Sequence, residues 1–156
     1  MDAVDNTVGQ VAEGKILRFD PIEAIKPEEL KTFLHDSPHQ FIKTVTHEFS
    51  AVCPFSGLPD LATVVIEYYP AVKKAVELKS LKYYMLSYRN VGIYQEGVTK
   101  KIYEDMYRAL GFGEPTEGSV APLRVTTHYH VRGGFYTTCV EGFLSSTPSI
   151  SYPENF

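Results

Sequence analysis

Tryptophan is absent from the 156 residues, and cysteine occurs only twice, at Cys53 and Cys139. Two cysteines so far apart could form one disulfide, but they cannot make the disulfide framework of a small secreted scaffold. No apolar run approaches the length that spans a membrane, and the opening residues MDAVDNTVGQ lack the hydrophobic core of a secretory signal. These absences favour a cytoplasmic protein in which a free thiol survives.

A large excess of charge is also missing, because the formal net charge is only -4 at pH 7. This acidic balance argues against a surface built mainly for nucleic acid. Hydrophobic residues make up 44% and charged residues 22%, which is typical of one soluble globular domain of this length. The 11 tyrosines and 9 phenylalanines suit strands, interfaces or a pocket that stacks a flat ligand.

The pattern of apolar residues predicts an α+β fold with the order strand, strand, helix, helix, strand, strand. β-Branched and aromatic runs indicate the strands, and apolar residues at helical spacing indicate the helices. We therefore expect a four-stranded antiparallel sheet with two helices on one face. The predicted strands cover residues 40–52, 61–69, 123–131 and 135–143, the last two around the turn Arg132-Gly133-Gly134, and the predicted helices cover 78–88 and 99–110.

The two ends of the chain differ from this central domain. Residues 1–14 are polar and without period, so we expect them to be poorly ordered. The string PEELKTFLH predicts a short helix with proline in its first turn and an apolar face made of Leu30, Phe33 and Leu34. The predicted organisation is an N-terminal extension with that short helix at 1–39, a folded domain at 40–144 and a Ser- and Pro-rich tail at 145–156.

An open sheet of four antiparallel strands has two exposed edges, and natural proteins cover or pair such edges. Pairing subunits edge to edge into a closed barrel is one solution. It predicts a homo-oligomer with sites between subunits.

The segment CPFSGLPD, from Cys53 to Asp60, places a thiol and a carboxylate on either side of a turn. Pro54, Gly57 and Pro59 restrict or permit unusual backbone angles, so the turn can hold both groups in a set relation. A thiol is a strong nucleophile and a nearby acid can transfer a proton, which together indicate covalent catalysis. A tight turn with a buried structural thiol is the alternative.

The segment ELKSLKYY opens the first predicted helix. Lys79 and Lys82 lie three residues apart, so both ammonium groups project from one side near its start. Ser80 and the free N–H groups of the first turn add donors, and together they could hold a phosphate. A solvated helix face with Glu–Lys pairs is the alternative.

Gln95 and Glu96 lie just before the second predicted helix. Glu96 is either an acid that favours the start of that helix or a carboxylate that accepts paired N–H donors from a guanine-like edge. His128 and His130 share one face of a strand and could join a cysteine in binding zinc, but no zinc-site spacing occurs, so we predict no metal site.

The segments CPFSGLPD, ELKSLKYY, SYRN, QE and RGG, in this order, resemble the 7-cyano-7-deazaguanine reductases. These are nitrile reductases of the queuosine pathway and members of the tunnelling-fold (T-fold) superfamily. The resemblance covers residues 40–143, and ELKSLKYY separates the reductases from the GTP cyclohydrolase branch. It implies that residues 40–144 form a catalytic T-fold domain.

The resemblance also implies residue roles. Cys53 would attack the nitrile carbon to form a thioimide, while Asp60 protonates the nitrogen. Glu96 would bind the pyrimidine edge of the deazaguanine. Gln95 and the backbone of Val76, Glu77 and Leu78 would also contact the base, and Lys79, Ser80, Lys82 and Arg132 would bind NADPH.

One position departs from the family pattern, because Gln95 stands where the family usually has histidine. Glutamine can hydrogen-bond the substrate but cannot carry a proton at neutral pH, so Asp60, His47 or water would cover that step. The expected partners are a small deazapurine and further copies of the chain, without membrane or direct nucleic-acid contact. A T-fold amidinotransferase acting on nitrile-bearing tRNA and a non-catalytic purine- or pterin-binding protein are the alternatives.

Overall fold

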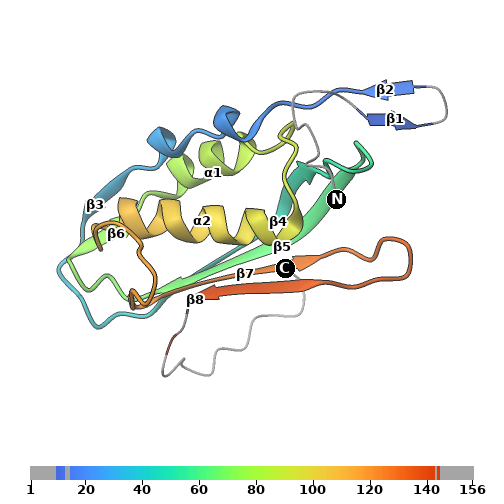
Figure 1. The fold of residues 1–156 in the computed structure, drawn as a ribbon. Coiled ribbons are helices and arrows are strands. Elements are labelled where there is room, and N and C mark those ends of the chain that lie inside the picture. The colour runs from blue at the N-terminus through green and yellow to red at the C-terminus, as the bar shows by residue number, and fades with distance from the viewer. Residues whose placement is uncertain (1–9, 13–14, 143, 145–156) are drawn as a thin grey trace.

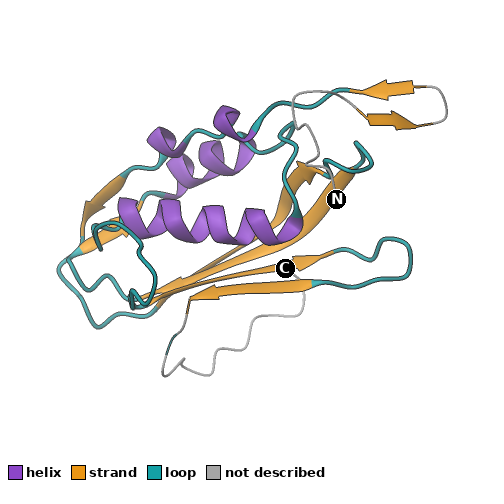
Figure 2. Ribbon diagram, in the orientation of Figure 1, coloured by secondary structure: helices purple, strands orange, loops and turns teal. Residues whose placement is uncertain are grey.

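The computed structural model describes residues 10–12, 15–142 and 144. Its centre is a four-stranded antiparallel sheet with the strand order β4-β5-β7-β8. Two helices, α1 (Leu78–Leu86) and α2 (Gln95–Ala109), lie side by side on one face of this sheet (Figures 1 and 2). The predicted α+β class, sheet and two-helix layer are confirmed. The strands are β4 (Ile42–Val52), β5 (Pro59–Tyr68), β7 (Leu123–Tyr129) and β8 (Thr138–Gly142).

The core lies between the helices and the sheet, where alternating residues of each strand point inward. In β7, for example, Arg124, Thr126 and His128 are only partly buried, and the residues that alternate with them are buried, namely Leu123, Val125, Thr127 and Tyr129. This alternation is the pattern of a sheet covered on one face. The largest fully buried side chains are Tyr84, Tyr88, Tyr129, Phe49, Ile66, Ile102, Met106, Leu110 and Leu123.

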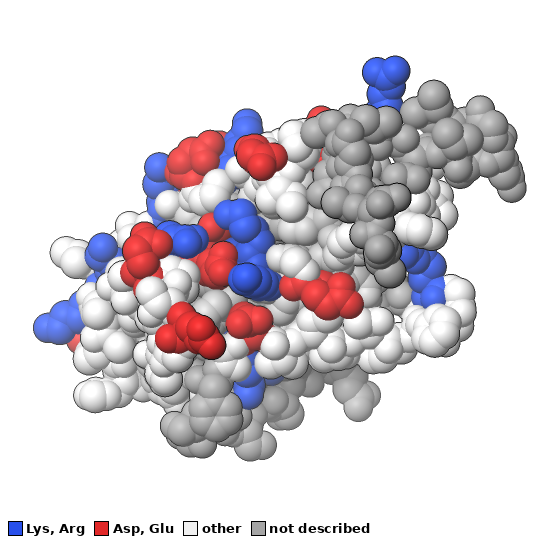
Figure 3. Space-filling view, viewed as in Figure 1, with Lys and Arg blue, Asp and Glu red and all other residues white. Residues whose placement is uncertain are grey.

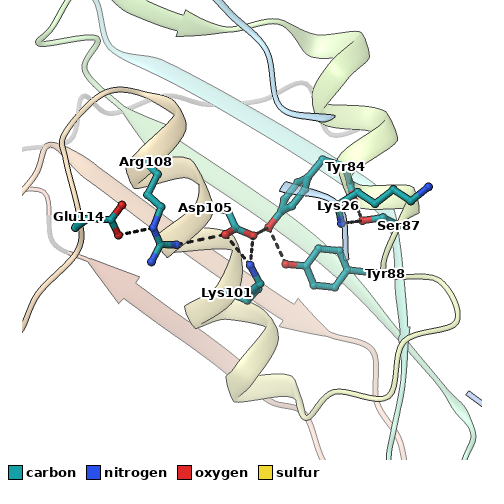
Figure 4. A network of polar contacts seen from close by, with 8 residues as sticks. All are labelled: Lys26, Tyr84, Ser87, Tyr88, Lys101, Asp105, Arg108 and Glu114. Carbon is teal, nitrogen blue, oxygen red and sulfur yellow. Dashed lines mark hydrogen bonds and ion pairs between the residues drawn. The ribbon is translucent and has the colours of Figure 1, made fainter. Parts of the chain in front are cut away.

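A polar network ties the two helices together inside this layer (Figure 4). The buried carboxylate of Asp105 accepts a 2.7 Å hydrogen bond from Tyr84 and pairs with Lys101 at 2.7 Å. The Tyr88 hydroxyl lies 2.7 Å from that of Tyr84, so it donates to Tyr84 in turn. Arg108, on the next turn of α2, also forms an ion pair with the Asp105 carboxylate. Burial raises the pKa of both tyrosines far above its ordinary value, so they stay neutral hydrogen-bond donors.

Two smaller sheets lie outside the main one, and each of them shows that a prediction from the sequence was wrong. The predicted helix at 27–35 is instead a single 3₁₀ turn, η2 (Pro27–Glu29), followed by strand β3 (Thr32–Leu34). Strand β3 pairs with β6 (Lys74–Val76), which a helix could not do. Of the three residues on the predicted apolar face, Leu30 is buried, whereas Phe33 and Leu34 are exposed, so no helical face is packed here.

The second correction concerns residues 10–12, part of the segment 1–14 that the sequence predicts to be poorly ordered; residues 1–9 and 13–14 lie outside the described residues. Strand β1 (Gln10–Ala12) pairs with β2 (Lys15–Leu17) in this region. A further 3₁₀ turn, η1 (Ile22–Ala24), follows β2. The predicted tail at 145–156 lies outside the described residues. Every helix within the described residues is too short or too polar to cross a bilayer.

The outer face of the helix layer carries charges of both signs. On the side seen in Figure 3, Lys and Arg side chains are interspersed with Asp and Glu over α2 and its surroundings. Ion pairs such as Lys100–Glu104 and Arg108–Glu114 account for part of this mixture. The face therefore has the character of a solvated helix surface.

Candidate active site

The turn between β4 and β5 fixes the position of Cys53. The last ladder pair joins Val52 to Pro59, and the Cys53 N–H donates to the Leu58 carbonyl at 2.9 Å. The Gly57 N–H donates back to the Cys53 carbonyl at 2.8 Å, with Gly57 in the left-handed region at a φ of 69°. A side chain at this position would be strained, so the glycine is a requirement of the turn. The predicted hairpin between the two strands is confirmed.

A cavity of about 340 Å³ opens beside this turn. It lies where the end of β4, the start of β5, the start of α2 and the end of β7 come together (Figure 1). Five of the residues predicted from the sequence to act in catalysis or in substrate or cofactor binding share its wall. They are Cys53, Asp60, Gln95, Glu96 and Arg132.

Asp60 is buried, and two donors meet the same one of its carboxylate oxygens. Arg132 Nη1 lies 2.8 Å from Oδ1, and Gln95 Nε2 donates to Oδ1 at 3.3 Å. Burial raises the pKa of Asp60, and the nearby Glu96 charge adds to this. Arg132 and Gln95 act in the opposite direction but do not cancel the effect of burial. Asp60 therefore binds a proton more tightly in the folded protein than an aspartate side chain does in water.

Cys53 is also buried, and burial alone would raise the pKa of its thiol. Hydrogen bonds from the Ser56 and Arg132 side chains and from the Ser56 and Phe55 backbone outweigh burial, so the pKa of Cys53 is lowered. A thiol with a lowered pKa is a better nucleophile at neutral pH because more of it is thiolate. The site therefore pairs a thiol of lowered pKa with a carboxyl group of raised pKa.

Helix α2 begins at Gln95, four residues before its predicted start, so Gln95 and Glu96 lie in its first turn. The sequence gives only a weak signal for this helix start, because the N-cap residue, Tyr94, makes no side-chain hydrogen bond to the first turn. The Gln95 carbonyl accepts from the Thr99 hydroxyl at 3.2 Å and from the Tyr129 hydroxyl at 3.3 Å. These bonds fix the helix start against β7. The exposed Glu96 faces the cavity from there, which is compatible with both of its predicted roles.

The second predicted group of residues lies at the start of α1. The sequence suggested free N–H groups there, but the Glu77 carboxylate caps the helix, accepting from the N–H groups of Lys79 at 2.9 Å and Ser80 at 2.8 Å. These bonds lower the pKa of Glu77. The buried Ser80 hydroxyl donates to the Glu77 carbonyl and accepts from the Lys31 N–H at 2.9 Å. The exposed ammonium groups of Lys79 and Lys82 remain as the groups open to an anion.

The two groups of predicted site residues lie at opposite ends of the helix layer. Helix α1 starts beside β6, whereas α2 starts beside the β4–β5 turn that carries Cys53 (Figure 1). None of the residues from Val76 to Lys82 lines the Cys53 cavity. Leu78 and Lys82 instead line a separate cavity of about 290 Å³ between α1 and β4. One chain alone therefore does not bring the two groups together.

Several cavity residues were not singled out for this site from the sequence. They are Phe55, Tyr94, Tyr129, His130 and Phe135. Tyr129 and His130 end a predicted strand, and Phe135 follows the predicted turn, but only the fold places these three beside Cys53.

The other candidate residues lie apart from the cavity. His47 bonds Thr63 on the exposed side of the sheet, and His128 bonds Thr138. Cys139 lies half-buried on β8 and is not part of the cavity wall. Within the described ranges, no three His, Cys, Asp or Glu side chains are placed to hold a metal ion.

Comparison with known proteins identifies the family. The profile of the family described as QueF-like protein matches residues 59–143. Proteins named NADPH-dependent 7-cyano-7-deazaguanine reductase from Thermotoga petrophila and Thermotoga maritima are each 50% identical over 138 residues, covering 88% of this chain and 95% of theirs. The protein of that name from Chloroherpeton thalassium is 41% identical over 121 residues, covering 76% of this chain and 97% of its own.

The chain belongs to the QueF-like family. The resemblance inferred from its short motifs is thereby confirmed over most of its length. The Cys53 cavity is accordingly the candidate active site of a QueF-like protein. The roles of its residues can be derived from what the reduction of a nitrile requires.

Proposed function

We propose that this protein reduces the nitrile of 7-cyano-7-deazaguanine to the aminomethyl group, with NADPH as reductant, through a thioimide on Cys53. The relatives carry the name of this activity. The observation that carries the mechanism is the buried Cys53 thiol, with its lowered pKa, beside the buried acid Asp60 in one cavity. This pairing is what addition of a thiol to a nitrile needs.

In the first step the Cys53 sulfur bonds to the nitrile carbon, and Asp60 gives a proton to the nitrogen. The nitrile thereby becomes a thioimide, whose C=N bond is activated for reduction. NADPH, when bound, supplies the two hydrides that a nitrile-to-amine reduction requires. The imine released when the Cys53 thiolate departs has to be kept from water until it is reduced.

The remaining cavity residues orient the substrate. Glu96, at the start of α2, would accept N–H donors from the pyrimidine edge of the base. Gln95, already hydrogen-bonded to Asp60, would hold the acid in place and contact the substrate. Because glutamine cannot give up or take a proton at neutral pH, Asp60 and water would carry out the proton transfer. His47, which lies away from the cavity, is not needed.

The start of α1 fits the phosphates of NADPH. Lys79 and Lys82 are exposed cations on one side of the helix, and the neighbouring cavity could take part of the cofactor. Ser80 would contribute by locking this helix start to the Lys31 backbone. The backbone of Val76, Glu77 and Leu78 at the same place would line the base, as the family resemblance implies.

These two ends would meet in a T-fold homo-oligomer whose sheets continue from one subunit to the next. Among the described residues, strands β4 and β8 are the edge strands of the main sheet. Phe55 and Phe135 line the Cys53 cavity yet are 74% and 79% exposed, so a single chain leaves the cavity poorly covered. A neighbouring subunit would cover them and bring its Lys79 and Lys82 toward Cys53. A free catalytic thiol also suits a cytoplasmic location.

The proposal is tested by adding 7-cyano-7-deazaguanine to the purified protein. Without NADPH, the intact mass should rise by the mass of one nitrile molecule per chain, and the added mass should map to Cys53. With NADPH, absorbance at the reduced-nicotinamide band should fall as the amine forms. An amidinotransferase or a non-catalytic binding protein would leave NADPH unconsumed, which would refute the reductase assignment.

A further inference from the structure

The hairpin between β7 and β8 places an arginine over the reacting groups. Arg132 and Phe135 exchange backbone hydrogen bonds of 3.1 Å across the turn, with Gly133 and Gly134 between them at φ values of 59° and 82°. Two consecutive positive φ angles are the geometry of a tight hairpin turn, for which glycine is well suited. The turn therefore gives Arg132 a defined position at the mouth of the cavity.

The Arg132 guanidinium contacts both members of the proposed reacting pair. Its Nη1 lies 2.8 Å from Asp60 Oδ1, and the same side chain hydrogen-bonds the Cys53 sulfur. Gln95 also donates to Oδ1. Among the described residues no donor meets Oδ2, so that oxygen is the one able to carry a proton.

We propose that Arg132 is a catalytic residue that holds Cys53 as the thiolate beside a neutral Asp60, whose Oδ2 carries the proton destined for the nitrile nitrogen. This inference rests on the thioimide route proposed above. It gives Arg132 a role beyond the cofactor contact suggested by the sequence.

The proton and charge balance of this arrangement is simple. The thiol proton moves to Asp60 Oδ2, and the Arg132 charge that faced the carboxylate is then balanced by the thiolate. The thiolate electron pair forms the S–C bond, one pair of the C≡N bond moves to nitrogen, and that nitrogen takes the proton from Oδ2. Asp60 ends as the carboxylate paired with Arg132, and no further reactant is required.

The electrostatic surroundings agree with this distribution of charge. Burial raises the pKa of Asp60, and Glu96 on α2 acts in the same direction, while Arg132 and Gln95 act against this rise without cancelling it. Burial would also raise the pKa of Cys53, but hydrogen bonds, including that of Arg132, bring it below the ordinary value. The other ionisable groups on the cavity wall are Tyr94 before α2 and Tyr129 and His130 at the end of β7.

The test is the pH dependence of Cys53 alkylation by iodoacetamide without any nicotinamide, followed by peptide mass so that Cys139 is counted separately. In Arg132→Gln, the alkylation midpoint should rise by about one pH unit, which makes alkylation roughly tenfold slower below both midpoints. Arg132→Lys keeps the positive charge but loses the planar guanidinium that donates to two groups at once, so its midpoint should lie between those of wild type and Arg132→Gln. Arg108→Gln, at an exposed arginine near the other end of α2 and outside both cavities, is the matched control and should keep the wild-type midpoint.

If Arg132→Gln and Arg132→Lys both keep the wild-type midpoint and raise only the KM for NADPH, Arg132 is a cofactor contact and the inference is wrong. Failure of the thioimide route would appear elsewhere, as a missing mass adduct between wild-type protein and the nitrile. The alkylation profile does not depend on that adduct. Far-UV circular dichroism on each variant checks the fold, and since Arg132 lies on an exposed turn, we expect native spectra.

Discussion

The two ends of the helix layer differ in what they offer to a reaction. The end with the β4–β5 turn holds buried groups with altered proton affinity, namely Cys53 and Asp60, together with Arg132. The other end, at the start of α1, holds exposed cations and a capped helix start. At the first end, burial raises the pKa of Asp60 and hydrogen bonds lower the pKa of Cys53. At the second end, exposure leaves the lysines free to bind a large charged molecule.

This difference indicates a division of labour along one chain. Bond making requires desolvated, preorganised groups, whereas holding phosphates requires accessible positive charge. Because the two ends are separated within a chain, the proposed complete site combines the reactive end of one subunit with the cationic end of another. The variants below test each end in turn, then the layer between them.

The largest effect is expected at the reactive end. Cys53→Ala removes the nucleophile, so it should abolish the mass adduct and lower kcat by more than about a thousandfold. NADPH oxidation with the nitrile as substrate measures this loss. Cys139→Ser is the matched control, because Cys139 lies on β8 away from the cavity wall, and it should keep adduct and turnover. Comparable turnover in Cys53→Ala would exclude covalent catalysis.

An intermediate effect is expected at the cationic end. Lys79→Ala combined with Lys82→Ala should raise the KM for NADPH more than about 100-fold, because each of the two charge-assisted hydrogen bonds lost is worth about 1.5–3 kcal/mol. Adduct formation with the nitrile, measured without NADPH, should change little. Equal losses in cofactor and nitrile binding would instead assign both lysines to the structure of α1.

The smallest effect on catalysis is expected in the layer between the ends. Tyr84→Phe removes one donor to the buried Asp105 and should lower the free energy of unfolding by about 1–2 kcal/mol. Urea unfolding measures this change, and KM and kcat should stay as in wild type at 25 °C. Tyr83→Phe, at an exposed neighbour on the same helix, should leave stability unchanged. A selective loss of kcat in Tyr84→Phe would show that the layer also shapes the site.

The order of elements and much of the candidate site could be predicted from the sequence because these features are local. The alternating pattern of β7 and the turn residues between Cys53 and Asp60 are visible in short stretches of chain. Pairing across long separations was not visible. The strand at Thr32–Leu34 forms only because Lys74–Val76 offers it a partner, which overrides a helix-like local sequence.

Long-range geometry also decides the role of Arg132. The family resemblance suggested that Arg132 contacts NADPH, and only the folded hairpin shows it beside Asp60 and Cys53. Likewise, the sequence indicated free N–H groups at the start of α1, but the capping rotamer of Glu77 occupies two of them. Such contacts depend on side-chain conformation and tertiary packing, which local patterns do not contain.

Subunit complementation tests the central claim, that each site combines the reactive end of one chain with the cationic end of another. Cys53→Ala chains and Lys79→Ala/Lys82→Ala chains, each inactive alone at low NADPH, are co-expressed so that they assemble together. Random assembly should restore about a quarter of wild-type NADPH oxidation, since one in four pairings joins two intact ends. Light scattering should show the same oligomer as wild type. No recovery in verified mixed oligomers, or a fully active monomer, would contradict the shared site.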